Sequence, residues 1–359
     1  MVSKACLVGT YQTKLEQIGQ QEDVELAVVV PPVWLDPAGP VRLERAHTAG
    51  YTLWVDPIRF NGQYHFHYYP KLSQRIAQFK PDIVHMDEEP YNLATFMGVR
   101  QARAAGAKTL FFTWQNLYRR YPIPFRWLES YVLNHVDYAL MGNQAAVEVF
   151  RRKGYAADKP HKVIPQFGVA EALFVPPPHG RDPNRSVIIG AAGRLVPEKG
   201  LDILLQAVAR LAGNWRLHLA GDGPARPSLE KLAHDLGIRE RVFFDGALPS
   251  TEMPTYLSQL DILVLPSRTR PNWQEQFGRI LVEAMACETA VVGSETGEIP
   301  HVIGEAGLTF PEGDVTALHA HLQNLIQQPH WRQELGRAGR ARVLANYTQG
   351  QIATQTTAV

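Results

Sequence analysis

The sequence predicts an α/β protein with two domains, each built on a parallel sheet that helices cover. Short apolar runs with strand propensity alternate with helix-periodic segments along the chain. The 359 residues correspond to about two domains of ordinary size. A stretch rich in proline and polar residues at 176–185 is typical of a linker. We therefore expect domains at 1–175 and 186–345, with a separate C-terminal segment at 346–359.

The first half of the chain contains strands and helices in turn. Short runs of β-branched and apolar residues predict the strands, and apolar residues three and four positions apart predict the helices. We expect strands at 5–8, 25–30, 52–55, 83–85, 109–113, 138–140 and 163–165, and helices at 70–79, 92–105 and 144–153.

The second half begins with an apolar run at 187–192, which predicts a buried strand. A helix with apolar spacing follows at 201–211, and strands and helices alternate behind it. We expect these further strands at 216–220, 242–244, 262–265, 290–292 and 308–310. Open α/β sheets bind ligands at the carboxyl ends of their strands. The loops that follow these strands are therefore the expected places for a site.

Composition limits the classes of function. Hydrophobic residues make up 45% and charged residues 20%, which is typical of a soluble globular protein. The net charge of +1 gives no reason to expect a nucleic-acid partner. The apolar runs are shorter than a membrane span and the N-terminus is unlike a signal peptide, so we expect a cytoplasmic protein. Cys6 and Cys287 fit two reduced thiols, and no Cys/His spacing indicates a metal site.

Residues 119–128 mix arginines with aromatic and apolar side chains. Basic-aromatic segments can lie at a membrane surface, which here would be the inner face of the membrane. We favour the alternative of a loop and first helical turn that pack on the domain. The spacing of Trp127, Leu128 and Tyr131 is typical of a core-facing helix. Peripheral contact with a membrane stays open as a second interpretation.

The segment 275–283 carries two glutamates around an expected helix start. Glu283 falls in an apolar run, where an ionised carboxylate is costly unless a hydrogen-bond donor reaches it. Glu275 precedes Gly278, where the helix is expected to begin and where free backbone N–H groups attract anions. Sugar hydroxyls together with a phosphate are the ligand chemistry that suits this segment. The alternative is a surface helix with two solvated glutamates.

A second segment, 193–200, joins the strand at 187–192 to the helix at 201–211. A strand, a glycine-bearing loop and a helix start form a phosphate-binding geometry. Arg194 offers a planar fork of donors and Lys199 a mobile point charge, a combination that matches a diphosphate. Taken alone, an ordinary turn with two solvated cations explains this loop better.

Together these segments resemble the donor half of family 4 of the retaining glycosyltransferases. The resemblance is close over about residues 185–345 and general before them. It implies the glycosyltransferase B-type fold, in which two Rossmann-like domains face each other across a cleft and the last segment returns toward the N-terminal domain. Its motifs are Gly193-Arg194 with Glu198-Lys199-Gly200, Gly221-Asp-Gly-Pro224, Glu275-x-Phe277-Gly278 with Glu283-Ala-Met-Ala286, and Gly297-Glu-Ile-Pro300.

The resemblance also implies roles for single residues on the donor side. Arg194 and Lys199 would hold the diphosphate, and Glu283 the ribose hydroxyls. Glu275 would contact the sugar, so that Glu275, Arg194 and Lys199 are the catalytic candidates. The remaining donor-binding candidates are Phe277, Gly278, Gly193, Ser267 and Gly221. A loop-capping role for Ser267 is an equal alternative, and Gly221 is expected to form a tight turn.

The acceptor side is expected in the N-terminal domain, in loops that follow strands. Of the adjacent carboxylates at 87–89, Glu88 or Glu89 is expected to touch the acceptor or the donor sugar; a solvated loop is the alternative. Many family members carry a histidine in one of these loops, where this chain has Gln115 and Asn116. The loop that contains Tyr11 is expected to close over the acceptor.

These expectations combine into a retaining, metal-independent hexosyltransferase of polysaccharide biosynthesis. It would move a sugar from a UDP- or GDP-linked donor to a glycan, lipid-linked or small-molecule acceptor. The nucleotide sugar would be a co-substrate, with no other cofactor, and the phosphate clamp would stabilise the leaving diphosphate. Two alternatives stay open: a non-catalytic nucleotide-sugar-binding regulator, and a nucleotide-sugar epimerase of the same architecture. A dinucleotide oxidoreductase is disfavoured because no G-x-G-x-x-G follows a strand.

Overall fold

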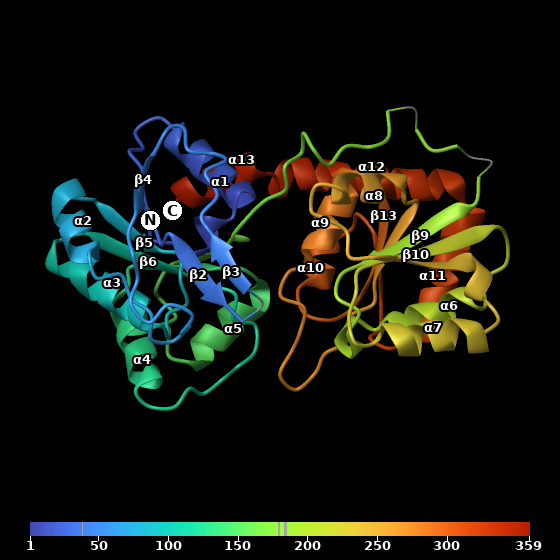
Figure 1. Cartoon of the computed structure of the whole chain (residues 1–359), viewed down its shortest axis with the longest axis horizontal. Coiled ribbons are helices and arrows are strands. Elements are labelled where there is room, and N and C mark those ends of the chain that lie inside the picture. The colour runs from blue at the N-terminus through green and yellow to red at the C-terminus, as the bar shows by residue number, and fades with distance from the viewer. Residues whose placement is uncertain (38, 179, 183–184) are drawn as a thin grey trace. The chain divides into compact units, whose positions relative to one another are not determined.

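The computed structural model describes residues 1–37, 39–178, 180–182 and 185–359, and these form two compact units. Unit 1 comprises Met1–Gly168 with Gln349–Val359, and unit 2 comprises Val169–Thr348. Positions 179, 183 and 184 of the expected linker lie outside the described residues, and the rest of that segment belongs to unit 2. Strands and helices alternate along both units (Figure 1).

Unit 1 contains a parallel sheet in two groups of strands. β1 pairs with β4, and β5, β6, β7 and β8 pair in that order. Val2 bridges Val29 of β1 and Met86 of β5, so it joins the two groups. A separate antiparallel hairpin consists of β2 (Val33–Asp36) and β3 (Gly39–Arg42). The parallel strands are β1 (Ala27–Val30), β4 (Thr52–Val55), β5 (Ile83–Met86), β6 (Lys108–Thr113), β7 (Tyr138–Met141) and β8 (His161–Val163).

Helices cover both faces of this sheet. α2, α3, α4 and α5 bury their apolar residues on one face, and α1 and α13 bury theirs on the other. Ile352 of α13 packs in a cluster with Leu110 of β6 and Leu140 of β7. The helices are α1 (Gly9–Gly19), α2 (Leu72–Phe79), α3 (Leu93–Ala104), α4 (Phe125–His135), α5 (Gln144–Arg152) and α13 (Gln349–Thr357).

The first expected strand, at 5–8, is wrong. Ala5–Leu7 form a short 3-10 helix, η1, and α1 then begins at Gly9. Val2 pairs with the sheet, after which Ser3 Oγ donates to Asp87 Oδ2 (2.6 Å) and the chain turns away. Apolar residues in this run are buried in a turn, and a short apolar run does not distinguish a turn from a strand. Neither α1 nor the hairpin β2–β3 was predicted, and Tyr11, which was expected in a loop, lies in α1.

The expected orientation of Trp127 is also wrong, because its side chain is 63% exposed. Val132 and Leu133 provide the core contacts of α4, and Glu129 is buried beside them. Two residues along a helix turn through roughly 200°. Trp127 therefore points away from the face that contains residue 129.

Unit 2 contains a parallel sheet with all six expected strands. The strand order is β11-β10-β9-β12-β13-β14. The chain reverses its direction of strand addition between β9 and β12, which is the switch point where open α/β sheets bind ligands. The predicted α/β class is confirmed. The strands are β9 (Val187–Ala192), β10 (Trp215–Ala220), β11 (Val242–Gly246), β12 (Ile262–Leu265), β13 (Ala290–Ser294) and β14 (Leu308–Phe310).

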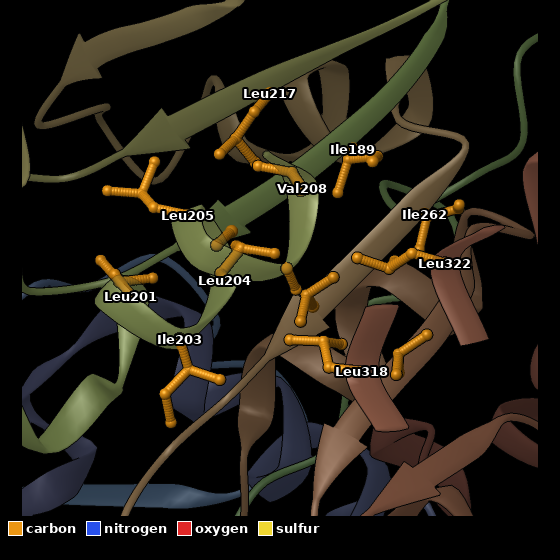
Figure 2. Close-up of a cluster of buried hydrophobic side chains, with 14 of the residues drawn as sticks. Ile189, Leu201, Ile203, Leu204, Leu205, Val208, Leu217, Ile262, Leu318 and Leu322 are labelled. Carbon is orange, nitrogen blue, oxygen red and sulfur yellow. The ribbon is translucent and has the colours of Figure 1, made fainter. Parts of the chain in front are cut away.

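The core of unit 2 packs α6, α7 and α11 on one face of the sheet, while α8, α9 and α10 pack on the other. Figure 2 shows Leu204 and Val208 of α6 beside Leu318 and Leu322 of α11, close to strand residue Ile262. Truncating one such side chain to Ala costs about 2–5 kcal/mol. The helices of this unit are α6 (Leu201–Val208), α7 (Arg226–Asp235), α8 (Met253–Gln259), α9 (Arg279–Ala286), α10 (Ile299–Ile303), α11 (Val315–Gln327) and α12 (Pro329–Asn346).

Candidate functional site

Two glycine-bearing loops meet at the carboxyl ends of β9 and β10. Gly193 follows β9 with a φ of +139°, and its N–H donates to Ala220 O (2.9 Å) at the end of β10. Gly221 has a φ of +134°, and a Cβ at this position would lie 1.9 Å from Gly193 O. Gly221 therefore permits the close approach of the two backbones that positions the Gly193 loop.

The Gly193 loop carries the two expected phosphate-binding cations. Arg194 is exposed, and Lys199 is half-buried at the end of the 3-10 helix η2 (Pro197–Lys199). Both line a small pocket, together with Gly193, at the ends of β9 and β12. The structure thus brings these three residues to the switch point of the sheet.

Glu275 lies beside Lys199. Lys199 Nζ is 2.6 Å from Glu275 Oε2, and Ser267 Oγ donates to the same oxygen (3.1 Å). The centroid of the Trp273 ring lies 5.0 Å from Lys199 Nζ. Ser267 is fully buried after β12, and its carbonyl accepts from Ser294 Oγ (2.6 Å). Lys199, Ser267, Trp273 and Glu275 are called the Lys199 cluster below; of these, only Trp273 was not expected from the sequence.

The loop after β13 holds the backbone of Glu275. Glu298 N–H donates to Glu275 O (3.2 Å). Gly297 has a φ of +55°, and a Cβ there would lie 1.9 Å from that same oxygen. The Gly297-Glu298 motif therefore places Glu275 through backbone contact, and a side chain at 297 would displace it.

α9 begins after Gly278, where the sequence predicts a helix start. Gly278 is the N-cap with a φ of +76° and provides no side-chain cap. Glu283 is 7% exposed, and Arg279 Nε donates to its Oε1 (2.6 Å). Burial raises the pKa of Glu283, and Arg279 opposes this shift. Phe277 is half-buried, with its ring edge-on to Tyr347 at 5.8 Å.

Unit 1 has a pocket of about 270 Å³, and residues from the loops after β5 and β6 line part of it. Tyr11, Glu88 and Glu89, three of the expected acceptor-side residues, line this unit 1 pocket. Gln115 and Asn116 are buried and are not among its lining residues. Lining residues that sequence reasoning missed include Lys4, Trp34, Asp36, Tyr64 and Gln166. They come from separate segments, so no local pattern indicated them.

The structure separates the roles of Glu88 and Glu89. Glu88 is fully buried, pairs with Lys4 Nζ and lies 3.6 Å from His67 Nε2. Burial alone would raise the pKa of Glu88, but the charges of Lys4 and His67 outweigh burial and lower it to about 2. The Glu88 carboxylate is therefore occupied by protein groups.

Glu89 is only partly buried by the chain around it. Its carboxylate accepts from Thr113 Oγ1 (2.6 Å) and Trp114 N–H (2.8 Å). Burial raises the pKa of Glu89 to about 7, although both hydrogen bonds oppose the shift. Glu89 thus changes its charge near neutral pH and is the better placed of the two glutamates to meet a ligand.

Gln166 fixes one wall of the unit 1 pocket. Its Oε1 accepts from Trp114 Nε1 (2.9 Å), and its Nε2 donates to Asp87 Oδ2 (3.0 Å). Beside it, Tyr11 stacks on Phe167 with 3.8 Å between ring centroids. Gln115 has a different environment, in which its Oε1 accepts from Lys153 Nζ (2.8 Å).

The described part of the chain contains neither a metal-binding cluster nor a membrane-spanning helix. Residues 1–37, 39–178, 180–182 and 185–359 contain no group of three or more His, Cys, Asp or Glu side chains arranged to hold a metal ion. Within these same ranges, no helix combines the length and the apolar character needed to cross a membrane.

Several relatives of known name share part of this sequence. Over 194 residues the chain is 31% identical to the GDP-mannose-dependent alpha-(1-6)-phosphatidylinositol monomannoside mannosyltransferase of Mycolicibacterium smegmatis, covering 50% of this chain and 51% of the relative. Over 203 residues it is 36% identical to the MMP alpha-(1->4)-mannosyltransferase of Mycolicibacterium hassiacum, covering 55% and 47%. The matched stretches thus span about half the length of these relatives.

Solved structures share the fold along nearly the whole chain. HepE of Anabaena, crystallised in complex with UDP, matches with a TM-score of 0.72 and 17% identity over 99% of this chain and 97% of that one. The sucrose-phosphate synthase of Thermosynechococcus elongatus matches with a TM-score of 0.67 and 21% identity over 96% and 90%. Both are glycosyltransferase B-type proteins, so the expected fold type is confirmed.

Two family descriptions match, one for each half of the sequence. Residues 8–165 match "Glycosyl transferase 4-like domain", and residues 178–342 match "Glycosyl transferases group 1". The second range contains Gly193, Lys199, Glu275 and Glu283, the residues that carried the resemblance. The chain therefore belongs to the group 1 glycosyl transferases.

Proposed function

We propose that the protein transfers a hexosyl residue from a UDP- or GDP-linked donor to a glycan, lipid-linked or small-molecule acceptor. The observation that carries this proposal is the Lys199 cluster, which lies with Arg194 at the switch point of the unit 2 sheet. Open α/β sheets bind nucleotides at this point, and paired cations suit a diphosphate. Membership of the group 1 glycosyl transferases supports the reaction class.

Each donor-side residue has a distinct role in this proposal. Arg194 and Lys199 bind the diphosphate and stabilise the charge that develops on it as the sugar leaves. The positive end of the α9 helix dipole stabilises the same diphosphate. Glu283 accepts hydrogen bonds from the ribose hydroxyls, and Arg279, which donates to its Oε1, opposes the rise in pKa that burial causes. When the donor binds, the Glu275 carboxylate releases Lys199 and accepts hydrogen bonds from hydroxyl groups of the sugar instead.

We also propose retention of anomeric configuration and independence of a metal ion. In a retaining transfer through same-face attack, the leaving diphosphate oxygen assists the incoming acceptor hydroxyl, so no carboxylate nucleophile is needed. Two cations and a helix N-terminus supply the positive charge that a metal would otherwise provide. EDTA should therefore leave the rate of transfer unchanged.

The names of relatives and the ligands of structural neighbours support a nucleotide-sugar donor. Relatives from Mycolicibacterium smegmatis and Corynebacterium glutamicum are named as GDP-mannose-dependent mannosyltransferases, and HepE was crystallised with UDP and with UDP-glucose. This chain spans only part of those relatives, so donors with either nucleotide have to be compared. A panel of UDP- and GDP-linked hexoses covers both classes.

For the acceptor, the unit 1 pocket is the proposed site, with Glu89 as a hydrogen-bond acceptor for its hydroxyl groups. A membrane surface is a proposed further partner of unit 1. Ile123 and Trp127 are 53% and 63% exposed, beside the exposed Arg119 and Arg120. Exposed aromatic and basic side chains favour the headgroup region of an anionic bilayer. Such contact fits a protein at the inner face of the membrane.

Release of free UDP or GDP from the donor panel, with and without acceptors, tests the proposal. Acceptor-dependent release, with a glycosylated product, supports a transferase. Conversion of one nucleotide sugar into another without an acceptor indicates an epimerase. Tight nucleotide binding with neither reaction indicates a regulator, and absence of nucleotide binding contradicts all three functions.

A further inference from the structure

The unit 1 pocket combines aromatic surface with carboxylates. Tyr11 and Trp114 are half-buried and Tyr64 is exposed, so each presents part of its ring. Such side chains contact the apolar face of a ligand while their polar atoms meet its hydroxyl groups. The volume of about 270 Å³ lies near the small end of ligand pockets, which span about 300–1,000 Å³. A single ring suits this volume better than an extended chain.

The charges that line the pocket are mostly negative. One lysine, Lys4, faces them, and it is already paired with Glu88. Asp87 is 3% exposed, and its Oδ1 has no hydrogen-bond partner among the described residues. The donors to its other oxygen, Ser3 and Gln166, are neutral. The lining carboxylates are Asp36, Asp87, Glu88 and Glu89.

The helix end beside the pocket does not offer a site for a phosphate. A helix N-terminus ordinarily favours an anion such as phosphate. At the start of α1, however, Gly9 N–H donates to Glu44 Oε2 (2.6 Å). The protein's own carboxylate therefore occupies the place that a phosphate would take, and Tyr11 in the same helical turn lines the pocket. Asp36 also lines the pocket, and Tyr64 Oη donates to its Oδ2 (2.5 Å).

We propose that the unit 1 pocket binds the acceptor through one hydroxylated ring that is uncharged or positively charged, and that it rejects a ring that carries phosphate. This inference rests on the proposed function and specifies its acceptor. Carboxylates accept hydrogen bonds from hydroxyl and ammonium groups, whereas a phosphate on the ring would face like charges, and the lining lysine, Lys4, is already paired with Glu88. Glu89 and Asp36 are the residues that set this preference.

Matched probes isolate the effect of charge. Common methyl hexosides, each as the neutral sugar, the 6-amino-6-deoxy analogue and the 6-phosphate, are compared by ligand-observed NMR on the full chain. Asp36→Asn removes one pocket charge and keeps an oxygen that accepts from Tyr64. Asp82→Asn makes the same change at an exposed residue of unit 1 that does not line the pocket. Calorimetry with UDP and GDP is run on the same samples.

The neutral and amino forms should bind at least about tenfold more tightly than the 6-phosphate. One uncompensated like charge at close range weakens binding by about this factor. Asp36→Asn should narrow that gap, and Asp82→Asn should leave it unchanged. Equal or tighter binding of the phosphate, an unaltered gap in Asp36→Asn, or binding of no member of the panel overturns the inference. Loss of UDP and GDP binding is a separate result, because it contradicts the proposed function and not the charge preference.

Discussion

Lys199 and Glu275 form an ion pair in unit 2, with Lys199 Nζ 2.6 Å from Glu275 Oε2. Their side chains are 19% and 12% exposed, so water screens this pair less than a pair on an open surface. A diphosphate that binds Lys199 has to compete with the Glu275 carboxylate. A substitution at either residue should therefore alter how the other meets the donor.

Lys199→Ala should weaken binding of UDP or GDP by about 1.5–3 kcal/mol, because it removes a charge-assisted contact and leaves Glu275 without its cation. Arg194→Ala should have a similar effect, and the double variant should lose less than the sum because both cations act on one group. Isothermal calorimetry measures the affinities. Arg210→Ala, at an exposed position of the same unit, is the matched control. Wild-type affinity in the double variant would contradict the phosphate clamp.

Glu275→Gln and Glu283→Gln should separate nucleotide binding from transfer. Glu275→Gln removes the carboxylate that competes for Lys199, so UDP or GDP should bind at least as well while transfer slows. Glu283→Gln should lower nucleotide affinity, because an amide offers one acceptor oxygen where the carboxylate offers two. Calorimetry and release assays on both variants give the comparison. An equal loss of nucleotide binding in the two would refute this division of roles.

Gly221→Ala should disturb the donor site through the backbone. The new Cβ would lie 1.9 Å from Gly193 O, so the two loops have to separate, and nucleotide affinity should fall together with melting temperature. Gly237→Ala is the control, because Gly237 also has positive φ (+70°) but a Cβ there meets nothing within 4 Å. The control should show only the cost of a left-handed alanine, about 1–2 kcal/mol in unfolding free energy. Equal nucleotide affinity in both variants would show that this approach does not position the site.

Glu89 should make stability depend on pH. Because its pKa is raised to about 7 in the folded chain from an ordinary value of 4.5, its protonated form stabilises the fold. That contribution is complete below the unfolded pKa and is lost as pH rises through about 7. Relative to Glu89→Gln, the wild type should therefore lose on the order of 1–3 kcal/mol of unfolding free energy between pH 4.5 and 8.

Denaturant unfolding of both proteins across this pH range gives the difference, in which other titrating groups largely cancel. Gln can still accept from Thr113 but meets Trp114 N–H less well. The variant can therefore be less stable at every pH. Only the slope of the difference is diagnostic, and a flat difference would mean that Glu89 titrates normally.

Trp127→Ser should reduce binding to anionic lipid vesicles, because it removes the most exposed aromatic side chain of residues 118–127. Co-sedimentation with vesicles of phosphatidylglycerol and phosphatidylcholine measures the bound fraction. Leu344→Ser, a 42% exposed apolar residue of unit 2, is the control and should leave the bound fraction unchanged. Equal binding of wild type and Trp127→Ser would exclude this segment as the membrane contact.

The sequence and the structure agree best where the information is local. The strand at 187–192, the loop with Lys199 and the helix start at Gly278 each depend on neighbouring residues, and the structure contains all of them. The ion pair between Lys199 and Glu275 depends on the sheet and was not predictable. The same holds for Arg279, whose contact with Glu283 depends on which helix face is buried.

The acceptor side shows the opposite case. Lys4 meets the residues after β5 because Val2 joins β1 to β5 and the chain then turns into α1, and Tyr64 reaches the same pocket from the segment between β4 and α2. An apolar run at 5–8 fits a strand by pattern, and burial alone does not decide otherwise. The make-up of this pocket therefore depends on strand pairing between distant segments, which a local sequence pattern does not predict.

The way each site is assembled has a consequence for attempts to change specificity. Most donor-side residues occupy two stretches of unit 2, 193–199 and 267–283, so exchanging these stretches between relatives would carry over most of the proposed nucleotide contacts. The unit 1 pocket takes its walls from residues as distant as Lys4, Trp34, Trp114 and Gln166. Exchanging one segment of the chain would not transfer all of these lining residues. New acceptors should therefore arise through several simultaneous substitutions, whereas new donors can be obtained by recombination.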